Sequence, residues 1–217
     1  MKNKKILLLR HGETNWNIQQ RFQGSHDIPL NENGEEQARA VASRISAWCP
    51  EIVWASPLQR ALRTAVIASG YPIDEISVLP ELREINFGAW EGRAVSELKA
   101  EGDLFARWAQ MPFKVPVPNA ETEDQILERA SQVLELLRQC EAEKILVVSH
   151  GGTLRALLAA ALQIPFQSAW KYFRLSNCSL TGLEYSGEKF VLAFYNDHLI
   201  LPKADGSESA AVLPIVF

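Results

Sequence analysis

Short runs of apolar residues, each closed by polar residues, mark the predicted strands of this chain. Continuous runs of four or so apolar residues are typical of strands buried on both faces of a sheet. Such runs occur at residues 6–9, 52–55, 145–148 and, less clearly, 76–79. Residues 178–185 and 190–195, separated by a polar turn, predict a β-hairpin.

Between these runs, apolar residues recur at helical spacing. Helices are predicted over residues 32–48, 122–139 and 151–162. Thr122 and Gln125 form a capping box at the start of the second of these helices. The stretch Ser56-Pro57-Leu58-Gln59 has a similar signature and predicts a further helix, with Ser56 as N-cap and Arg60 in the first turn.

Strands that alternate with helices predict an α/β protein in three layers, with a mainly parallel sheet, right-handed crossovers and the hairpin as an antiparallel edge. Residues 86–120 interrupt this pattern with tryptophans and a cluster of prolines. They predict an irregular insertion with one or two short helices that covers a site, or, as the alternative, only a sheet edge. We therefore expect a single domain over residues 1–217, with 86–120 as a substrate-covering insertion.

Composition narrows the classes of partner. The 217 residues are 47% hydrophobic and 22% charged, with a net charge of −4, which disfavours nucleic acid and anionic membranes as partners. No stretch approaches the roughly 20 apolar residues of a membrane span, and the apolar stretch near the start is too short for a signal peptide, so we expect a cytoplasmic protein. The apolar segment 212–217 predicts docking on the same domain or on a second copy in a homodimer.

The three cysteines, Cys49, Cys140 and Cys178, are odd in number and far apart. Their spacing fits neither a disulfide framework nor a zinc site. We expect them to be buried small apolar residues in a reducing compartment. His26 and His198 are given no functional role.

Chemically reactive side chains follow the predicted strands. Arg10 and His11 follow the run 6–9, His150 follows the run 145–148, and Arg60 lies just beyond the run 52–55. Because ligands bind at the carboxyl ends of parallel strands, we expect these four side chains to converge on one phosphate-sized pocket. A neutral imidazole can attack phosphorus, and guanidinium groups both bind phosphate oxygens and favour the neutral imidazole.

The leaving alkoxide of a phosphate ester needs a proton, which a carboxylic acid can supply. Glu13 and Glu84 are the candidates. Glu84 is favoured because it follows a predicted strand and precedes the insertion. His150 is suited to donate a hydrogen bond to a phosphate oxygen, and Gly151 begins a helix whose free N–H groups attract anions.

Leu9-Arg10-His11-Gly12-Glu13-Thr14 resembles the signature of the histidine phosphatase superfamily, the phosphoglycerate-mutase-like proteins. Further segments match this family in order: Asn17 with 21–24, 30–38, 56–65, 82–92 and 148–152. The resemblance implies a three-layer α/β/α sandwich and a transfer that needs no metal and no cofactor. It also implies His11 as the phosphorylated nucleophile, Glu84 as the proton donor, and a phosphate pocket made of Arg10, Arg60, His150, Asn17 and Gln23.

Other residues of the resembling segments are expected to contact the substrate. Gly24 belongs to the phosphate-contacting loop, Arg21 adds positive charge at the mouth, and Trp90 and Phe22 are placed near the substrate because aromatic side chains line small-molecule pockets. The expected ligand is a small phosphate ester. Phosphoserine, a ribazole phosphate, a sugar phosphate and a phosphoglycerate all fit family precedent.

The segment 87–92 and the compact insertion resemble the phosphatase branch of the family, so we expect a phosphomonoesterase. Basic residues in the insertion could meet a substrate carboxylate, which leaves phosphoglycerate mutase activity as the alternative. Asn119-Ala120-Glu121-Thr122 departs from the Gly-Glu-Ser turn of many relatives. A non-catalytic phosphate-binding module is the second alternative. Thiol phosphatase, P-loop, Gly-x-Ser-x-Gly and Gly-x-Gly-x-x-Gly motifs are absent from the sequence.

Overall fold

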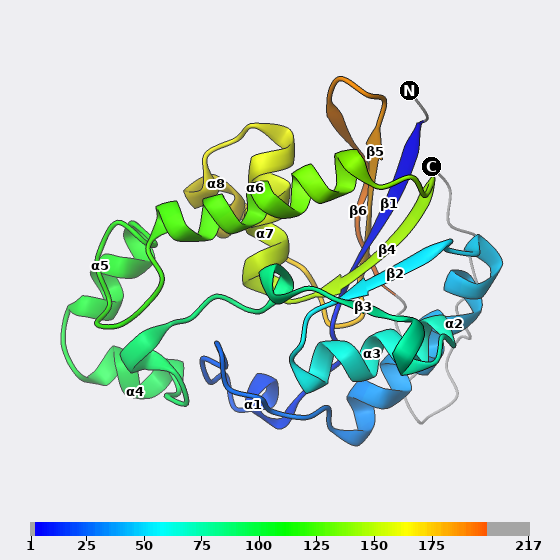
Figure 1. Cartoon of the computed structure of the whole chain (residues 1–217). Coiled ribbons are helices and arrows are strands. Elements are labelled where there is room, and N and C mark those ends of the chain that lie inside the picture. The colour runs from blue at the N-terminus through cyan, green and yellow to red at the C-terminus, as the bar shows by residue number, and fades with distance from the viewer. Residues whose placement is uncertain (1–2, 199–217) are drawn as a thin grey trace.

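The structure is a computed structural model that describes residues 3–198 of the chain. A six-stranded sheet with the order β3-β2-β4-β1-β5-β6 forms its centre (Figure 1). The four strands from β3 to β1 are parallel, and β5 pairs antiparallel with both β1 and β6. The strands are β1 (Lys4–Arg10), β2 (Ile52–Ala55), β3 (Ser77–Val78), β4 (Lys144–Ser149), β5 (Leu180–Tyr185) and β6 (Phe190–Asp197). The predicted mainly parallel sheet with an antiparallel edge is confirmed.

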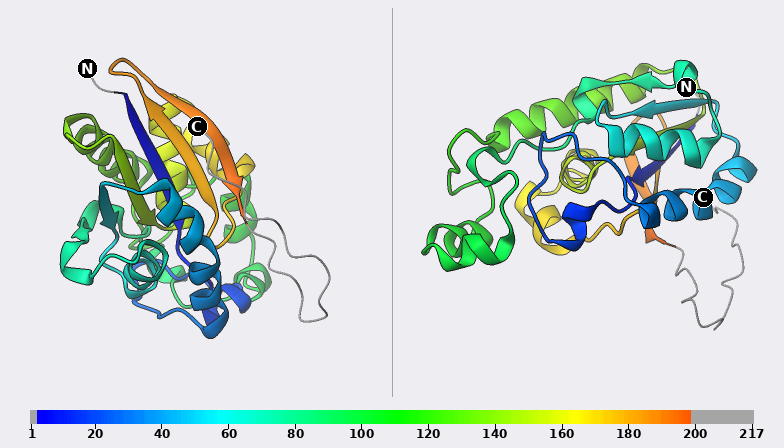
Figure 2. Two further views of the ribbon diagram at one scale, coloured as in Figure 1. Left: turned by 90° about the vertical axis from the view of Figure 1, so that its right-hand side faces the viewer. Right: turned by 90° about the horizontal axis from the view of Figure 1, so that it is seen from below.

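Helices cover both faces of the sheet, as predicted for a three-layer sandwich. In Figures 1 and 2, α6 and α7 lie on one face and α2 and α3 on the other. The α-helices are α1 (Asn15–Ile18), α2 (Glu32–Trp48), α3 (Gln59–Ser69), α4 (Val95–Ala100), α5 (Leu104–Gln110), α6 (Glu123–Gln139), α7 (Gly151–Leu162) and α8 (Phe166–Tyr172). Short 3-10 helices occupy Ile73–Glu75, Pro80–Leu82 and Gly88–Trp90. In the described residues, no helix is both long and apolar enough to cross a bilayer.

The continuous apolar runs of the sequence reflect strands that are buried on both faces. In β1, Ile6 and Leu8 pack with α6 and α7, whereas Leu7 and Leu9 pack with α2 and α3. Successive side chains of a strand point to opposite faces, so both sets must be apolar when helices cover both faces. Burial on both faces holds the strands rigidly. It therefore also fixes the positions of the residues that directly follow each strand.

The insertion builds a core of its own. Aromatic rings of Phe87, Trp90, Trp108 and Phe113 pack with Phe22, Phe166 and Trp170, in a cluster separate from the two sheet cores. Figure 1 shows α4 and α5 at the side of the molecule, away from the sheet. One or two short helices were predicted for the insertion, and α4 and α5 are the two α-helices that it contains.

Several predicted details of the fold are wrong. Helix α3 begins at Gln59 with Leu58 as N-cap, and the Ser56 hydroxyl does not cap it. Helix α8 was not predicted, and β5 begins at Leu180, two residues later than expected. Of the cysteines only Cys178 is buried, while Cys140 is half-buried and Cys49 is exposed. Residues 212–217, on which the docking prediction rests, lie outside the described residues.

Candidate active site

The parallel strands bring the chemically reactive segments together. β1 and β4 are neighbours with Arg10 opposite Ser149, so His11 and His150 follow their strands side by side. The His11 N–H donates to the Ser149 carbonyl over 2.9 Å, and the two imidazole centroids lie 5.1 Å apart. Sheet register alone therefore places the two predicted histidines in contact.

A cavity of about 210 Å³ opens above these strand ends. Ten of the residues predicted for the site line it: Arg10, His11, Asn17, Arg21, Phe22, Gln23, Gly24, Arg60, Glu84 and Gly151. His150 is fully buried beneath it, against His11. The structure does not bring Trp90 to this cavity, because its side chain is buried among Phe22, Phe105 and Trp108. Glu13, the other acid considered, instead accepts hydrogen bonds from Asn31 and Asn33 beside α2.

His11 is held in the tautomer that a nucleophile requires. Its Nδ1 lies 2.6 Å from the Gly12 carbonyl oxygen, which can only accept, so Nδ1 carries the proton. Burial, with the charges of Arg60 and Arg10, holds the pKa of His11 well below its usual value. The ring is therefore neutral at neutral pH, and Nε2 carries the lone pair.

His150 is oriented by a buried serine. Its Nε2 lies 2.7 Å from the Ser56 hydroxyl, which also accepts the Leu58 N–H. Burial is the main cause that keeps the pKa of His150 well below its usual value, with Arg60 and His11 adding to it. The Ser56 hydroxyl can donate or accept in this bond, and in the tautomer whose Nε2 accepts, Nδ1 carries a proton. Nδ1 is buried with no partner among the described residues.

Four arginines line the cavity and give it positive charge: Arg10, Arg21, Arg60 and Arg155. Arg60 donates to the carbonyls of Gly24 and His26, which fixes the loop that carries Gln23. Arg10 donates to the Leu175 carbonyl, and its pKa is lowered to about 10 by burial and by Arg155. Burial also lowers the pKa of Arg60 and of Arg155. All remain cations at neutral pH, so crowding them in a buried site favours an anion as occupant.

Glu84 lines the same cavity and rests on the first turn of α7. Its carboxylate accepts the N–H groups of Gly152 and Thr153, at 3.1 and 3.0 Å, and the Thr153 hydroxyl. The free N–H groups expected to serve the phosphate are thus partly used by this acid. Gly151, one residue earlier, still faces the cavity.

Buried polar atoms without partners gather at this site. Among the described residues, such side-chain atoms number six: Arg10 Nε, Gln23 Oε1, Arg60 Nε, His150 Nδ1, Arg44 Nε and Ser179 Oγ. The first four belong to residues predicted for the phosphate pocket. A buried polar atom left unpaired costs about 1–3 kcal/mol, so these groups favour a ligand that pairs with them. Rotation of the Gln23 amide presents its NH₂ group, which makes all four able to donate.

The sequence did not single out Arg155 or Trp170, which also line the cavity. The Arg155 guanidinium lies 5.1 Å from the Trp170 ring centroid and donates to the carbonyls of Phe173 and Gly151. Helical spacing from Gly151 was the available signal for Arg155, since it lies one turn further along the same helix. Trp170 lies on α8, which has no periodic pattern. Phe87 and Phe22 complete the wall.

Within residues 3–198, no group of three or more His, Cys, Asp or Glu side chains is placed to hold a metal ion. The side chains around the cavity are cationic or neutral donors, with Glu84 as the acid among the lining residues. Such a donor set fits an oxyanion.

Comparison with known proteins identifies the family. A profile of the Histidine phosphatase superfamily (branch 1) matches residues 6–198. The chain is 34% identical over 194 residues to a Bacillus subtilis protein named Uncharacterized phosphatase PhoE, covering 88% of this chain and 93% of that one. It is 36% identical over 185 residues to Probable phosphoglycerate mutase GpmB of Photorhabdus laumondii, covering 83% and 84%.

A solved structure agrees. The crystal structure of phosphoserine phosphatase from Entamoeba histolytica, in complex with 3-phosphoglyceric acid, has a TM-score of 0.78 at 30% identity and covers 89% of this chain and 97% of that one. This chain belongs to the histidine phosphatase superfamily, branch 1. The family resemblance seen in the sequence, and the fold that it implied, are both confirmed.

Proposed function

We propose that the protein is a metal-independent phosphomonoesterase that hydrolyses a small phosphorylated metabolite through a phosphohistidine at His11. The observation that carries this proposal is the state of His11. A neutral imidazole with its lone pair on Nε2 lies in a cavity lined by four arginines. We further propose that residues 1–217 form one catalytic domain, in which the insertion contributes Phe87 to the wall of the cavity.

Phosphate binding uses the unpaired donors. Arg10, Arg60 and His150 approach the phosphate oxygens from the strand ends, and Gln23 approaches from the loop that Arg60 fixes. Asn17 already uses its side-chain oxygen to accept from Thr14, so its NH₂ group is the end available to the ligand. Charge-assisted bonds of this kind are about twice as strong as neutral ones.

Hydrolysis then takes two steps. In the first, His11 Nε2 attacks phosphorus, the bond from phosphorus to the ester oxygen breaks, and Glu84 donates its proton to the leaving alkoxide. In the second step, Glu84 takes a proton from water, the water oxygen attacks phosphorus and the phosphorus–nitrogen bond breaks. Inorganic phosphate leaves and His11 is again neutral.

The remaining residues that line the cavity suggest the substrate class. Arg155, stacked on Trp170, and Arg21 place two further cations beside Phe22 and Phe87. A guanidinium binds a carboxylate bidentately, so we propose a substrate that carries a carboxylate near its phosphate ester, of the phosphoserine or phosphoglycerate kind. Two structures of one related protein support this class: the Entamoeba histolytica phosphoserine phosphatase in complex with 3-phosphoglyceric acid, and a mutant of it in complex with phosphoserine.

The same cations favour phosphoglycerate mutase as the second candidate, since a mutase must also hold a carboxylate. Incubation of the purified protein with a panel of phosphorylated metabolites distinguishes the two candidates. Release of inorganic phosphate is expected, with loss of turnover in His11→Asn at unchanged circular dichroism. Isomerised phosphoglycerate without phosphate release would instead establish the mutase. Turnover retained by His11→Asn, or the absence of turnover across the panel, would contradict both.

A further inference from the structure

The proton donor lies in a segment that has no strand or α-helix to hold it. Residues 83–87 are irregular and follow the 3-10 helix Pro80–Leu82. What fixes this segment is a set of hydrogen bonds to its backbone. On one side, the Ser149 hydroxyl donates to the Leu82 carbonyl over 2.7 Å and the Thr153 hydroxyl donates to the Arg83 carbonyl over 2.6 Å.

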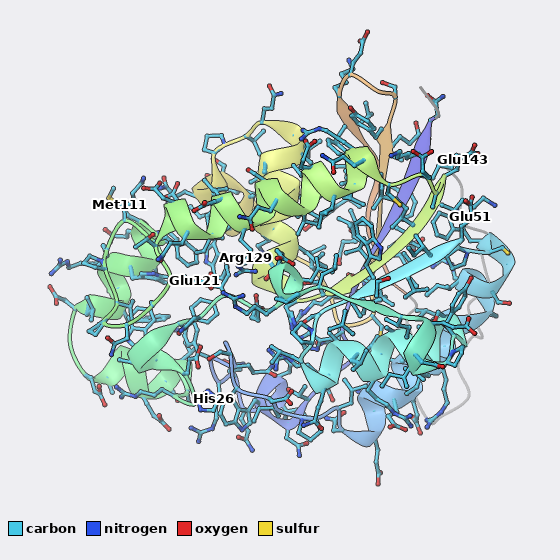
Figure 3. All side chains as sticks on the ribbon, viewed as in Figure 1. His26, Glu51, Met111, Glu121, Arg129 and Glu143 are labelled. Carbon is cyan, nitrogen blue, oxygen red and sulfur yellow. The ribbon has the colours of Figure 1, made fainter. Side chains whose placement is uncertain are left out.

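The other side of the segment is held by Arg129 of α6, which is almost fully buried. Its Nη1 donates to the carbonyls of Glu81 and Arg83, both at 2.7 Å. Nε and Nη2 bind the two carboxylate oxygens of Glu121, at 3.1 and 3.0 Å. Figure 3 shows the labelled Arg129 and Glu121 side by side, between α6 and the extended segment.

Glu121 extends this clamp past Glu84. Its Oε2 accepts the Asn86 N–H over 2.7 Å, and its own backbone N–H donates to the Asn86 carbonyl over 2.9 Å. One guanidinium thus holds the chain at residues 81 and 83, and through Glu121 at residue 86. Glu84 is the residue in the middle of the fixed stretch.

We infer that Arg129, acting with Glu121, is a positioning residue that sets where the Glu84 carboxyl stands relative to the ester oxygen. A buried ion pair is weak evidence for stability, because the desolvation of two charges offsets much of their attraction. Here Arg129 and Glu121 both form hydrogen bonds to backbone groups that flank Glu84. General acid catalysis requires the acid to lie within hydrogen-bond distance of the leaving oxygen. A displacement of this backbone therefore slows proton donation. The inference rests on the proposed function.

The test uses leaving groups that differ in their need for a proton. An alkyl phosphate such as phosphoserine leaves as an alkoxide and needs the acid, whereas p-nitrophenyl phosphate leaves as a stable phenolate. We expect Arg129→Met to lower kcat for the alkyl ester about 10–100-fold, with KM within about 3-fold, and to lower kcat for the aryl ester less than about 3-fold. Arg129→Lys, which keeps the charge and part of the bonding, should recover part of the loss.

A double variant ties the effect to the acid. In a Glu84→Gln background, adding Arg129→Met should cause no further loss on the alkyl ester, because the group being positioned is gone. Arg138→Met is the matched control, since Arg138 lies on the same helix but is exposed. If Arg129→Met does not fold, Glu121→Gln replaces it. We expect its kcat to fall selectively for the alkyl ester too, but by a smaller factor.

Two results would overturn the inference: equal losses on both esters in Arg129→Met, or multiplied losses in the double variant. The proposed function stays intact in either case if Glu84→Gln lowers kcat more for the alkyl ester than for the aryl ester. If Glu84→Gln lowers kcat equally for the two esters, Glu84 is not the proton donor. This result would overturn both the inference and the proposed role of Glu84. Loss in the Arg138→Met control of the same size and selectivity as in Arg129→Met would also contradict the inference, because it would show a general effect of removing charge from α6.

Discussion

The Glu84 carboxylate rests on the backbone of Gly152, whose N–H donates to Oε2 over 3.1 Å. A Cβ atom on residue 152 would lie 2.7 Å from Glu84 Oε1 and 2.8 Å from Ile85. Glycine is therefore the residue that allows the acid this close to the start of α7. The same turn of helix begins at Gly151, which faces the cavity. The acid and this part of the cavity wall thus share one rigid support.

Gly152→Ala should displace the acid without disturbing the nucleophile. The added methyl group meets a carboxylate oxygen and the Ile85 side chain, so Glu84 must move by a few tenths of an ångström or more. We expect kcat for an alkyl phosphate to fall about 10-fold or more, because proton donation contributes about 100-fold or more to such reactions. Steady-state kinetics with phosphoserine and with p-nitrophenyl phosphate measure this. Unchanged kcat for phosphoserine would show that Glu84 tolerates the displacement or is not the donor.

Ser56→Ala should weaken phosphate binding. It leaves Nε2 of His150 buried without its partner and frees the ring to rotate. The loss of such a bond is worth about 1.4 kcal/mol, which corresponds to about a 10-fold weaker inhibition by inorganic phosphate or vanadate. Ser179→Ala is the control, because the Ser179 hydroxyl is buried without a partner in the described structure. Equal inhibition constants for the wild type and Ser56→Ala would contradict the role given to Ser56.

Stability should fall with decreasing pH because of the two histidines. The pKa values of His11 and His150 are held well below normal, mainly by burial and then by Arg60. In the unfolded chain both titrate near pH 6.5, so below about that value the unfolded chain binds more protons than the folded one. The free energy of unfolding then decreases as the pH falls, by up to about 1.4 kcal/mol per pH unit for each histidine.

Urea unfolding at about pH 7 and about pH 5 measures this slope. His11→Asn removes one titrating group and keeps a donor for the Gly12 carbonyl, so its free energy of unfolding should depend less steeply on pH in this window. His198→Asn is the control, since His198 is exposed. An unchanged slope in His11→Asn would mean that His11 titrates alike in the folded and unfolded chain.

Arg155→Gln should change substrate preference. If this guanidinium binds a substrate carboxylate, its loss raises KM for phosphoserine about 10-fold or more, because hydrogen bonds to charged groups are worth about 1.5–3 kcal/mol. Glycerol phosphate has no carboxylate and should be affected much less. Arg155→Lys keeps the charge without the fork and isolates the bidentate contribution. Parallel losses on both substrates would show that Arg155 serves the phosphate alone.

Much of the fold and of the site was predictable because strong local signals agree with the tertiary structure. The Thr122 capping box starts α6 where expected, and the apolar runs become the central strands. His11, His150, Arg10 and Arg60 were predictable as neighbours because strand ends of a parallel sheet meet at one edge. Their roles in catalysis stay predictions until the variants are measured.

The remaining features depend on contacts that a single sequence does not display. Ser56 has the local pattern of a helix cap, but its hydroxyl forms a hydrogen bond with the buried His150, and α3 begins later, at Gln59. Trp90 and Trp170 are equivalent as residue types, and the packing of the aromatic cluster decides that Trp170 faces the cavity. Helix α8 begins after Pro165 and is only 7 residues long, too short for a periodic pattern to be read.

The aromatic cluster, described above as a third core, has a consequence for adaptation. Most groups proposed to hold the phosphate follow β1 and β4 or lie on α3 beside the sheet, whereas the residues that face the rest of the cavity come from α8, the loop at Phe22 and the start of the insertion. These two sets belong to separately packed cores. Substitutions at Phe22, Phe87 or Trp170 can therefore re-shape which esters are accepted without retuning the reaction, which makes this wall the natural place to evolve or engineer new selectivity.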